Sequence, residues 1–214
     1  MKPFTQIAIP HEDIVKGRLT MDVFAADLWQ VVQGKAPIDY QDPDLFFKKT
    51  YTTDGLKNIL EIAKARLEGK SGDSIIQLQT PFGGGKTHTL IALYYKAKEW
   101  NAKVAVIDGT ALNPKEKKLW EEIERQLTGK VELTKGDTAP GKEKLLELLS
   151  ANSPVLILID ELLEYITKAA GVKVGDSNLA AQTFAFIQEL TGAVATVGNA
   201  LLVLTRPSSI LEHY

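Results

Sequence analysis

A run of three glycines, at positions 83–85, constrains the fold of this chain more than any other feature. Before it, residues 74–79 (SIIQLQ) form a short apolar run of the kind found in a buried strand. After it, residues 87–100 (THTLIALYYKAKEW) have the composition of a helix. In a strand, loop and helix of this order, glycines let successive backbone N–H groups point at one anion, and the helix N-terminus adds partial positive charge. The segment therefore predicts a phosphate-binding loop.

Residues 80–87 (TPFGGGKT) match most of the phosphate-loop pattern G-x-x-x-x-G-K-[ST]. Gly85, Lys86 and Thr87 fit the pattern, whereas Thr80 stands where its first glycine is expected. The lysine of such a loop reaches the β- and γ-phosphates, and the hydroxyl that follows it can hold Mg²⁺. The residues expected to contact the nucleotide are Pro81, Phe82, Gly83, Gly84, Gly85, Lys86, Thr87 and His88. The alternative is a glycine-rich turn that only caps a helix.

Strand-like and helical segments continue to alternate up to residue 205. Further strands are expected at 103–107 (KVAVI), 155–160 (VLILID) and 200–205 (ALLVLT), and helices at 114–127, 142–149 and 177–197, with Pro114 in a first turn and Ser177 as a cap. Short connections between such segments give right-handed crossovers and a mostly parallel sheet that helices cover on both faces. We therefore expect an α/β fold of three layers. With the four strands numbered along the chain, the order 1-4-3-2 in the sheet would insert the last strand between the first and the third.

The part of the chain before the sheet is predicted to be helical. A helix with Thr20 as its cap is expected over residues 20–33, and two prolines indicate a linker at 35–45. A second helix is expected from Thr53, its cap, to Leu67. This divides the chain into a helical arm and linker at 1–45 and a core at 46–214. Because the sequence stops soon after the last strand, we expect the core to be truncated at its C-terminal end.

Two acidic residues end the strand at 155–160. Asp160 would emerge at the carboxyl edge of the sheet beside the phosphate loop, where it can hold the Mg²⁺ shell. Glu161 follows directly and can activate a water for attack on the γ-phosphate. The predicted metal residues are thus Thr87 and Asp160, and the predicted catalytic residues include Glu161 and Lys86. The alternative is a pair of solvated acids that merely end a strand.

Three further positions carry weaker signals. Thr205 ends the last strand, where its hydroxyl can touch the γ-phosphate or the attacking water, and we include it among the catalytic candidates; a turn residue is the alternative. His88 is interpreted as a packed or capping residue rather than a catalyst. The aromatic side chains that precede the first core helix can stack on an adenine or simply fill the core: Phe46, Phe47 and Tyr51.

Composition excludes several classes of protein. The chain has no cysteine, which rules out disulfide scaffolds, iron–sulfur ligation and thiol catalysis. With 25 basic and 27 acidic residues, its net charge of −2 gives no bulk attraction to nucleic acid. No apolar window is long enough for a membrane span and the N-terminus lacks the pattern of a signal peptide, so we expect a cytoplasmic protein without a membrane partner.

The segments PFGGGKTHTLIALYY and LILIDELLEY resemble a family of large prokaryotic P-loop ATPases related to the AAA+ class. That family was long catalogued as a domain of unknown function, and its members occur in gene clusters with DNA methyltransferases and phage-defence proteins, including BREX/Pgl-type systems. The opening DPDLFFKKTYTTDGLKNIL and the helix KKLWEEIERQL are also similar. The resemblance covers most of this chain, which is similar to the N-terminal ATPase portion of longer members.

The resemblance implies a P-loop NTPase fold of AAA+ type and ATP with Mg²⁺ as cofactors. It implies that Lys86 and Thr87 are the phosphate and Mg²⁺ groups and that Asp160 and Glu161 are the Mg²⁺ and catalytic acids. The function expected is the ATPase motor or switch of a nucleic-acid-related defence or modification complex, with weak turnover from this chain alone. DNA bound through other parts, further subunits of such a complex and a homo-oligomer are the partners left open. A regulatory nucleotide-binding module with slow turnover is the alternative, and a small-molecule kinase is a third.

Overall fold

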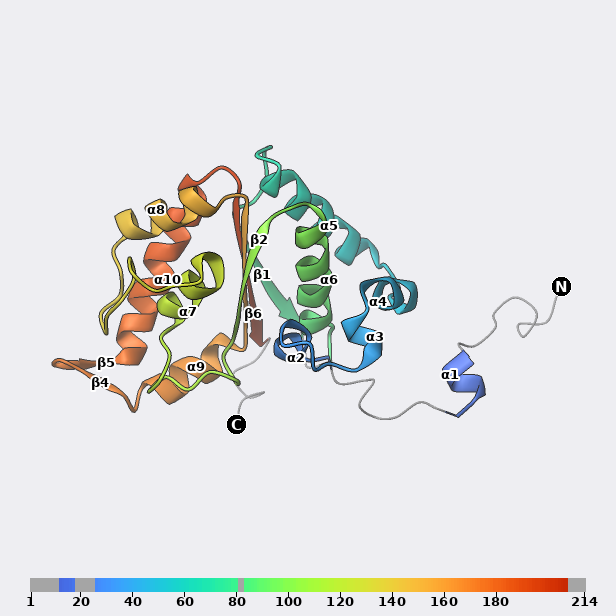
Figure 1. The fold of residues 1–214 in the computed structure, drawn as a ribbon, viewed down its shortest axis with the longest axis horizontal. Coiled ribbons are helices and arrows are strands. Elements are labelled where there is room, and N and C mark those ends of the chain that lie inside the picture. Colours follow the sequence, from blue (N-terminus) through green and yellow to red (C-terminus); the bar gives the residue numbers. More distant parts are fainter. Residues whose placement is uncertain (1–11, 18–25, 81–82, 208–214) are drawn as a thin grey trace.

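Four parallel strands form the centre of the molecule. The computed structural model describes residues 12–17, 26–80 and 83–207. The strands are β1 (Ile75–Thr80), β2 (Lys103–Asp108), β3 (Val155–Asp160) and β6 (Ala200–Pro207), and their order in the sheet is β1-β6-β3-β2. The last strand therefore lies between the first and the third (Figure 1), which confirms the predicted α/β fold and strand order.

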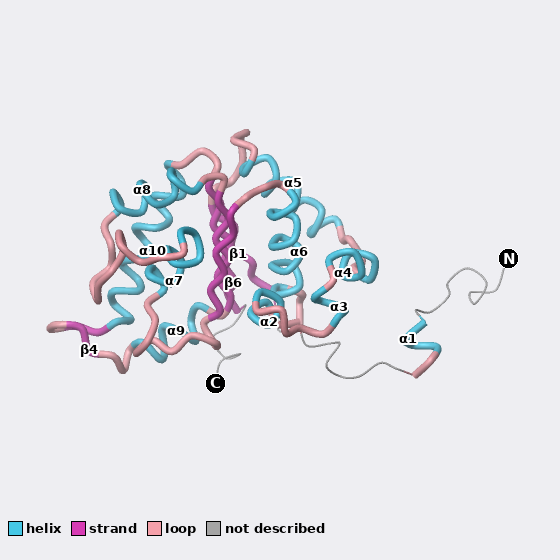
Figure 2. Tube along the Cα trace, viewed as in Figure 1, coloured by secondary structure: helices cyan, strands magenta, loops and turns pink. Residues whose placement is uncertain are grey.

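Helices cover both faces of the sheet, so that three layers are visible when the strands are viewed on edge (Figure 2). One face carries α2 (Leu28–Val32), α5 (Asp54–Leu67) and α6 (Lys86–Glu99). The other carries α7 (Leu119–Thr128), α8 (Lys142–Asn152), α9 (Leu162–Ala169) and α10 (Leu179–Thr196). All six residues of β3 are buried, as expected for a central parallel strand that has an apolar layer on each side.

The segment before the sheet contains more helix than the sequence predicted. Residues 35–45, for which two prolines indicated a linker, contribute to α3 (Ile38–Gln41) and α4 (Pro43–Lys49). Pro43 occupies the first turn of α4, where a missing N–H group costs nothing, and Asp42 caps that turn by accepting from the Leu45 N–H at 3.0 Å.

The helix expected over residues 20–33 is shorter in the part that the structure describes. It begins at Leu28 and is capped by Asp27, and the predicted cap Thr20 lies outside the described residues. Another short helix, α1 (Glu12–Val15), precedes it. The side chains of Leu28 and Val31 are buried in the same apolar cluster as α5 and α6. The proposed division of the chain at residue 45 stays a prediction.

Helix ends follow local hydrogen bonding, which the sequence indicated correctly for α5. Thr53 caps this helix by accepting from the Leu56 N–H at 3.2 Å. The prediction for α7 was wrong at its start, because this helix begins at Leu119 and not at Pro114. The helix α9 directly after β3 was not predicted at all.

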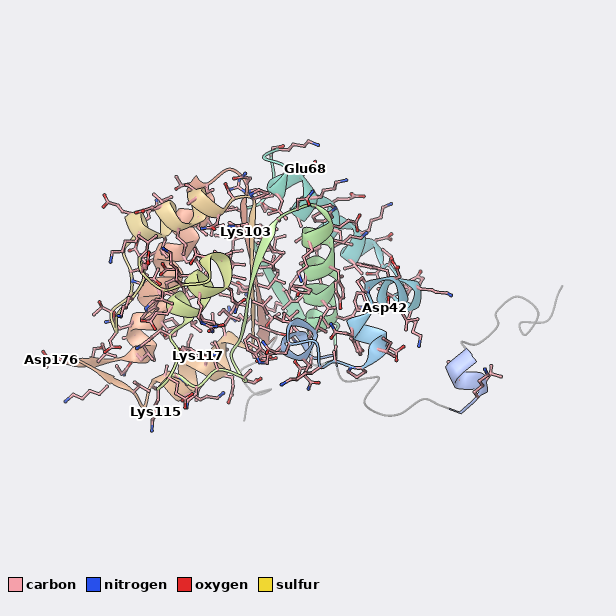
Figure 3. All side chains as sticks on the ribbon, viewed as in Figure 1. Asp42, Glu68, Lys103, Lys115, Lys117 and Asp176 are labelled. Carbon is pink, nitrogen blue, oxygen red and sulfur yellow. The ribbon has the colours of Figure 1, made fainter. Side chains whose placement is uncertain are left out.

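A small hairpin precedes the longest helix. Its strands are β4 (Lys173–Val174) and β5 (Ser177–Asn178), and Asp176 lies at its tip (Figure 3). Ser177 was predicted to cap α10, but it belongs to this hairpin. Asn178 caps the helix instead and accepts from the Ala181 N–H at 3.0 Å.

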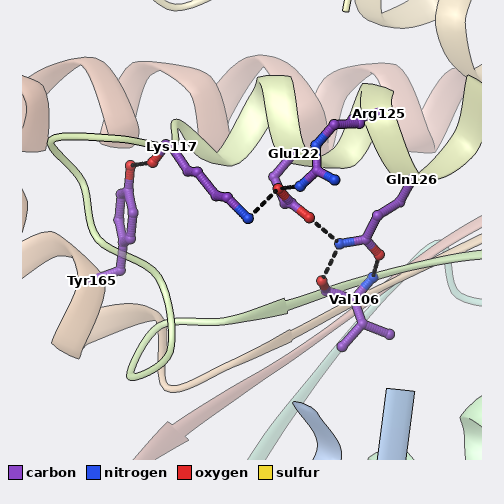
Figure 4. A network of polar contacts seen from close by, with 6 residues as sticks. All are labelled: Val106, Lys117, Glu122, Arg125, Gln126 and Tyr165. Carbon is purple, nitrogen blue, oxygen red and sulfur yellow. Dashed lines mark hydrogen bonds and ion pairs between the residues drawn. The ribbon is translucent and has the colours of Figure 1, made fainter. Parts of the chain in front are cut away.

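Polar side chains of α7 close the open edge of strand β2. The Gln126 amide accepts from the Val106 N–H and donates to the Val106 carbonyl, both at 2.8 Å (Figure 4). The same amide donates to Glu122, which also forms ion pairs with Arg125 and with Lys117. Gln126 thus gives Val106 the hydrogen bonds that a neighbouring strand would otherwise supply.

Two charged side chains, one buried and one half-buried, each make several hydrogen bonds to connecting segments of the chain. The Glu124 carboxylate is almost completely buried and accepts from the backbone N–H groups of Glu132, Leu133 and Thr134 and from the Thr134 hydroxyl. Arg66, on α5, donates to three carbonyl groups where α10 ends and β6 begins: Val194, Val197 and Ala200.

Across the described part of the chain, no helix combines the length and the apolar composition that a membrane crossing requires.

Candidate functional site

The carboxyl ends of the strands meet at one edge of the sheet, the lower edge in Figure 1. The glycine loop follows β1 at this edge, Asp160 ends β3, and Thr205 lies near the end of β6. In open parallel sheets, ligands bind at the carboxyl edge because the loops and helix N-termini converge there. The fold therefore brings together segments that are more than seventy residues apart in the sequence.

A hydrogen bond joins the glycine loop to the end of β3. The Thr87 hydroxyl donates to Asp160 Oδ2 over 2.9 Å, although 73 residues separate the two positions. Thr87 lies in the first turn of α6 directly after Lys86. The two residues predicted to hold a metal are therefore in direct contact.

Thr205 joins the same cluster from the neighbouring strand. Its hydroxyl donates to Asp160 Oδ1 over 2.6 Å, and its oxygen accepts from the Glu161 N–H over 3.2 Å. The Glu161 N–H also lies 3.1 Å from Asp160 Oδ1. Asp160 is only 3% exposed, so its charge is stabilised by these donors rather than by water.

The pKa of Asp160 reflects a balance between burial and hydrogen bonding. Burial in the sheet raises this pKa, while the hydrogen bonds from Thr205, Thr87 and the Glu161 N–H lower it. The carboxylate of Asp108, which is the partner of Asp160 in the register of β2 and β3, raises it further. The net effect is an increase above the ordinary value, so a cation bound near this carboxylate would stabilise its charged form.

The glycine loop has the backbone conformation that the motif requires at two positions. Gly83 and Gly85 have φ angles of 74° and 78°, in the left-handed region that favours glycine. Gly85 immediately precedes α6, which puts the N-terminus of a fourteen-residue helix at the loop. The Lys86 ammonium donates to the Thr80 carbonyl over 3.1 Å and so lies across the loop. Pro81 and Phe82, also predicted to contact the nucleotide, lie outside the described residues.

Glu161 occupies the corner between β3 and α9. Its backbone is left-handed, with φ 49° and ψ 42°, which is uncommon for a residue with a side chain. It is half-buried, unlike the Leu162 side chain that follows it into the core. The corner turns the chain at the point where the phosphate loop, Asp160 and Thr205 meet.

His88 is packed against the segment before the sheet, as the sequence indicated. Its ring lies 4.6 Å from the Phe46 ring between centroids, and its Nε2 is 2.9 Å from the Thr50 hydroxyl oxygen. Since the single proton of Thr50 is donated to the Phe46 carbonyl at 2.7 Å, His88 Nε2 must carry the proton of that contact. Burial lowers the pKa of His88, which favours this neutral ring.

A cavity of about 160 Å³ opens beside His88. It is lined by aromatic rings, a hydroxyl and an ion pair, from Asp39, Tyr40, Phe46, Lys49, Thr50 and His88. Phe46 therefore contributes both to the core and to this cavity. The other two aromatic candidates do not line it, and Tyr51 is mostly exposed.

Sequence reasoning missed Asp108 and the glycine that follows it. Asp108 is buried at the carboxyl end of β2 and accepts from the N–H and hydroxyl of Thr110 and the N–H of Ala111. A signal was present, because the run KVAVID ends in an aspartate as VLILID does. Gly109 contacts the Glu161 carbonyl, which no sequence pattern revealed.

Comparison with protein families gives a match over nearly the whole chain. The model described as the DUF499 N-terminal domain matches residues 7–135 and 114–210. The chain belongs to the DUF499 family. The site described above therefore lies within the matched DUF499 region, at positions from the glycine loop to Thr205. No curated protein matches the chain.

Proposed function

We propose that this DUF499 domain is a P-loop NTPase of AAA+ type that binds ATP with Mg²⁺ and hydrolyses it. The observation that carries the proposal is the contact between the Thr87 hydroxyl and the Asp160 carboxylate at the mouth of a glycine loop. A loop that only capped a helix would need neither a lysine across it nor a buried acid against its threonine. The three features together are those of a site for a phosphate–metal complex.

The phosphates would lie against the N–H groups of residues 83–87. The left-handed conformations of Gly83 and Gly85 support such a concave backbone, and the helix N-terminus contributes favourable charge. The Lys86 ammonium, which donates to a backbone carbonyl in the structure described here, would exchange that contact for phosphate oxygens.

The residues around Thr87 fit a magnesium ion. The Thr87 oxygen can coordinate a cation through a lone pair while its O–H still donates to Asp160, since a hydroxyl has both a donor and acceptor lone pairs. Among the described residues, no group of three histidine, aspartate or glutamate side chains forms a metal site of its own. Magnesium commonly keeps most of its ligands as phosphate oxygens and water, so one hydroxyl and one nearby carboxylate suffice. Bound Mg²⁺ would neutralise charge on the β- and γ-phosphates.

Glu161 is the proposed general base. It follows Asp160 at the carboxyl edge and is half-buried, so a water beside it could lose a proton to its carboxylate during attack on the γ-phosphate. Thr205 would orient this corner, since its hydroxyl contacts both Asp160 Oδ1 and the Glu161 N–H. Lys86 would stabilise the charge that develops on the transferred phosphate.

The cavity beside His88 supports a nucleotide rather than free phosphate as the ligand. His88 directly follows Thr87 in the first turn of α6, so the cavity lies near the N-terminus of the helix that follows the glycine loop. Its aromatic lining suits the face of a base, and the Asp39 carboxylate can accept from the exocyclic amine of adenine. The comparison of ATP with inosine triphosphate, which lacks that amine, tests this assignment, and equal affinity for the two nucleotides would contradict it.

In the cell, the proposed role is the motor or switch of a nucleic-acid-related complex, in phage defence or DNA modification. This part rests on the family resemblance, and DNA and further subunits are the proposed partners. The alternative is a regulatory module that holds ATP and turns it over slowly. Adding DNA to the ATPase assay separates the two, because stimulated turnover favours the motor and an unchanged slow rate favours the module.

Nucleotide binding is tested with Lys86→Ala, with Lys144→Ala as the matched control. Lys144 is an exposed lysine on α8, on the opposite face of the sheet from α6. We expect Lys86→Ala to abolish measurable binding of a fluorescent ATP analogue in Mg²⁺, because the charge-assisted contact is lost. Lys144→Ala should bind as the parent does. Parent-like affinity and turnover in Lys86→Ala would refute the phosphate site.

Catalysis is tested with Glu161→Gln, which keeps the shape of the side chain but cannot accept a proton. We expect retained ATP affinity and turnover lower by about 10²–10⁴-fold. Asp160→Asn is expected instead to weaken the dependence of turnover on Mg²⁺. Parent-rate hydrolysis by Glu161→Gln would mean that another group activates the water.

A further inference from the structure

The loop after β2 presses against the corner that holds Glu161. A β-carbon at Gly109 would lie 1.9 Å from the Glu161 carbonyl oxygen and 2.7 Å from the carbonyl carbon. The φ angle of Gly109 is not in the left-handed region, so backbone conformation does not require glycine here. Space alone does, because the two backbones are in direct contact.

Three hydrogen bonds keep this loop in place. The Gly109 N–H donates to the Asp160 carbonyl over 2.9 Å, which continues the pairing of β2 with β3 by one residue. The Lys168 ammonium, on α9, donates to the carbonyl groups of Gly109 and Thr110 over 3.0 and 2.8 Å. A lysine on α9, the helix that Glu161 immediately precedes, therefore holds the loop after β2 against that helix.

The backbone of Glu161 is consequently held on both sides. Its N–H group lies between Asp160 Oδ1 and Thr205 Oγ1, at 3.1 and 3.2 Å. Its carbonyl accepts from the Glu164 N–H at 3.1 Å and abuts Gly109. These contacts hold the backbone of Glu161 in its uncommon left-handed conformation. The direction in which the Glu161 side chain points depends on that conformation.

We infer that Gly109, together with Lys168, positions the Glu161 carboxylate for water activation. The inference rests on the proposed ATPase function, and both residues act through Glu161 without touching the nucleotide. Any side chain at position 109 would force the two backbones apart by about 1.1 Å, because its β-carbon would otherwise lie 1.9 Å, and not at least 3.0 Å, from the Glu161 carbonyl oxygen. A misplacement of about 1 Å in a catalytic group can cost about 10²-fold in rate.

The test uses Gly109→Ala in the full 214-residue chain, with Gly198→Ala as the control. Gly198 precedes the opposite, amino-terminal end of β6, and a β-carbon there meets nothing within 4 Å. We expect Gly109→Ala to bind ATP within about threefold of the parent and to hydrolyse it about 10²-fold more slowly in single-turnover measurements. Gly198→Ala should match the parent in both. Turnover within about threefold of the parent in a folded Gly109→Ala would overturn the inference.

The double variant Gly109→Ala/Glu161→Gln separates positioning from general damage. If Gly109 acts through Glu161, adding Gly109→Ala to Glu161→Gln should lower the residual rate by less than about twofold, because residues that act as a unit are not additive. Losses that multiply in the double variant would show that position 109 affects turnover by another route, and would overturn the inference.

Lys168→Met provides a variant that adds no volume at the corner. It removes the ammonium but keeps an unbranched side chain, so it decides the question if Gly109→Ala does not fold. We expect parent-like ATP affinity, turnover about tenfold lower, and no further loss in the Glu161→Gln background. Parent-rate turnover in Lys168→Met would contradict the positioning role of Lys168.

The failure of this inference is distinguishable from failure of the proposed function. If Glu161→Gln is slow while Gly109→Ala and Lys168→Met are as fast as the parent, only the positioning role fails. If Glu161→Gln itself keeps the parent rate, the general-base assignment fails and the positioning role fails with it.

Discussion

Replacing Thr205 with valine tests the centre of the candidate site while hardly changing the shape of the side chain. Thr205 is 4% exposed, and its hydroxyl donates to Asp160 Oδ1 over 2.6 Å. Valine removes this charge-assisted hydrogen bond but fills the same space. The Glu161 N–H keeps a hydrogen-bond acceptor after the change, because Asp160 Oδ1 lies 3.1 Å away.

The expected loss of stability follows from this arrangement. Hydrogen bonds to charged groups are worth about 1.5–3 kcal/mol, so we expect the free energy of unfolding to fall by about 2 kcal/mol. For a chain of this length, that corresponds to a decrease in Tm of about 4–8 °C. In the proposed ATPase, turnover should fall more than nucleotide affinity, since the hydroxyl contacts the two acidic residues and not the phosphate loop.

The assay is urea and thermal unfolding of Thr205→Val, with Thr183→Val as the matched control. Thr183 is likewise buried, but its hydroxyl donates to the neutral Leu179 carbonyl within α10, so its loss should cost less than about 1 kcal/mol. Thr205→Ser should recover most of the difference because it restores the hydroxyl. Equal losses at the two threonines, or no loss at Thr205, would refute the argument that Asp160 depends on this donor.

Three further predictions concern stability and assembly. Burial raises the pKa of Glu124, but its four hydrogen bonds lower it more, so that the pKa lies below the ordinary value of 4.5. The stability that the charged Glu124 contributes is therefore present above pH 4.5 and is lost as the pH falls through the folded-state pKa. We expect Glu124→Gln to lower the free energy of unfolding in urea by about 2–3 kcal/mol at neutral pH, and this deficit should shrink as the pH falls through that pKa. A constant deficit down to about pH 3 would contradict this. Arg66→Lys should lower the unfolding free energy by about 2 kcal/mol, because an ammonium cannot match the three-carbonyl geometry, and a melting curve identical to that of the parent would argue against it. ATP turnover per chain should be slow and should rise with protein concentration, because an arginine supplied by a second copy can add about 10³–10⁵ in rate. A rate independent of concentration would count against assembly in trans.

The features that the sequence predicted are those with a local or strictly periodic signal. The continuous apolar run of β3 identified a buried strand, and the polar residue at its end, Asp160, was predicted to lie near the glycine loop because parallel strands end at one edge. Thr53 was recognised as a cap because the signal for a helix start lies within four residues.

The features that the sequence did not predict depend on contacts between distant segments. The start of α7 at Leu119 and the cap of α10 at Asn178 were displaced by a turn and by a hairpin that the helical periodicity does not encode. The contact between Gly109 and Glu161 arises from the register of two strands, and glycine at a strand end is common for many other reasons. Such positions become visible only when the pairing of the strands is known.

The side chain of Gln126 gives the two edges of the sheet different capacities for growth. At β2, an amide from α7 already occupies the N–H and carbonyl groups of Val106, so an incoming strand would first have to displace it. Strand β1 forms the other edge among the described residues, where β6 is its one partner in the sheet. Lateral extension of this sheet, whether by another segment or by unwanted self-association, should therefore proceed from β1, and substituting Gln126 with leucine should make the β2 edge more prone to aggregation.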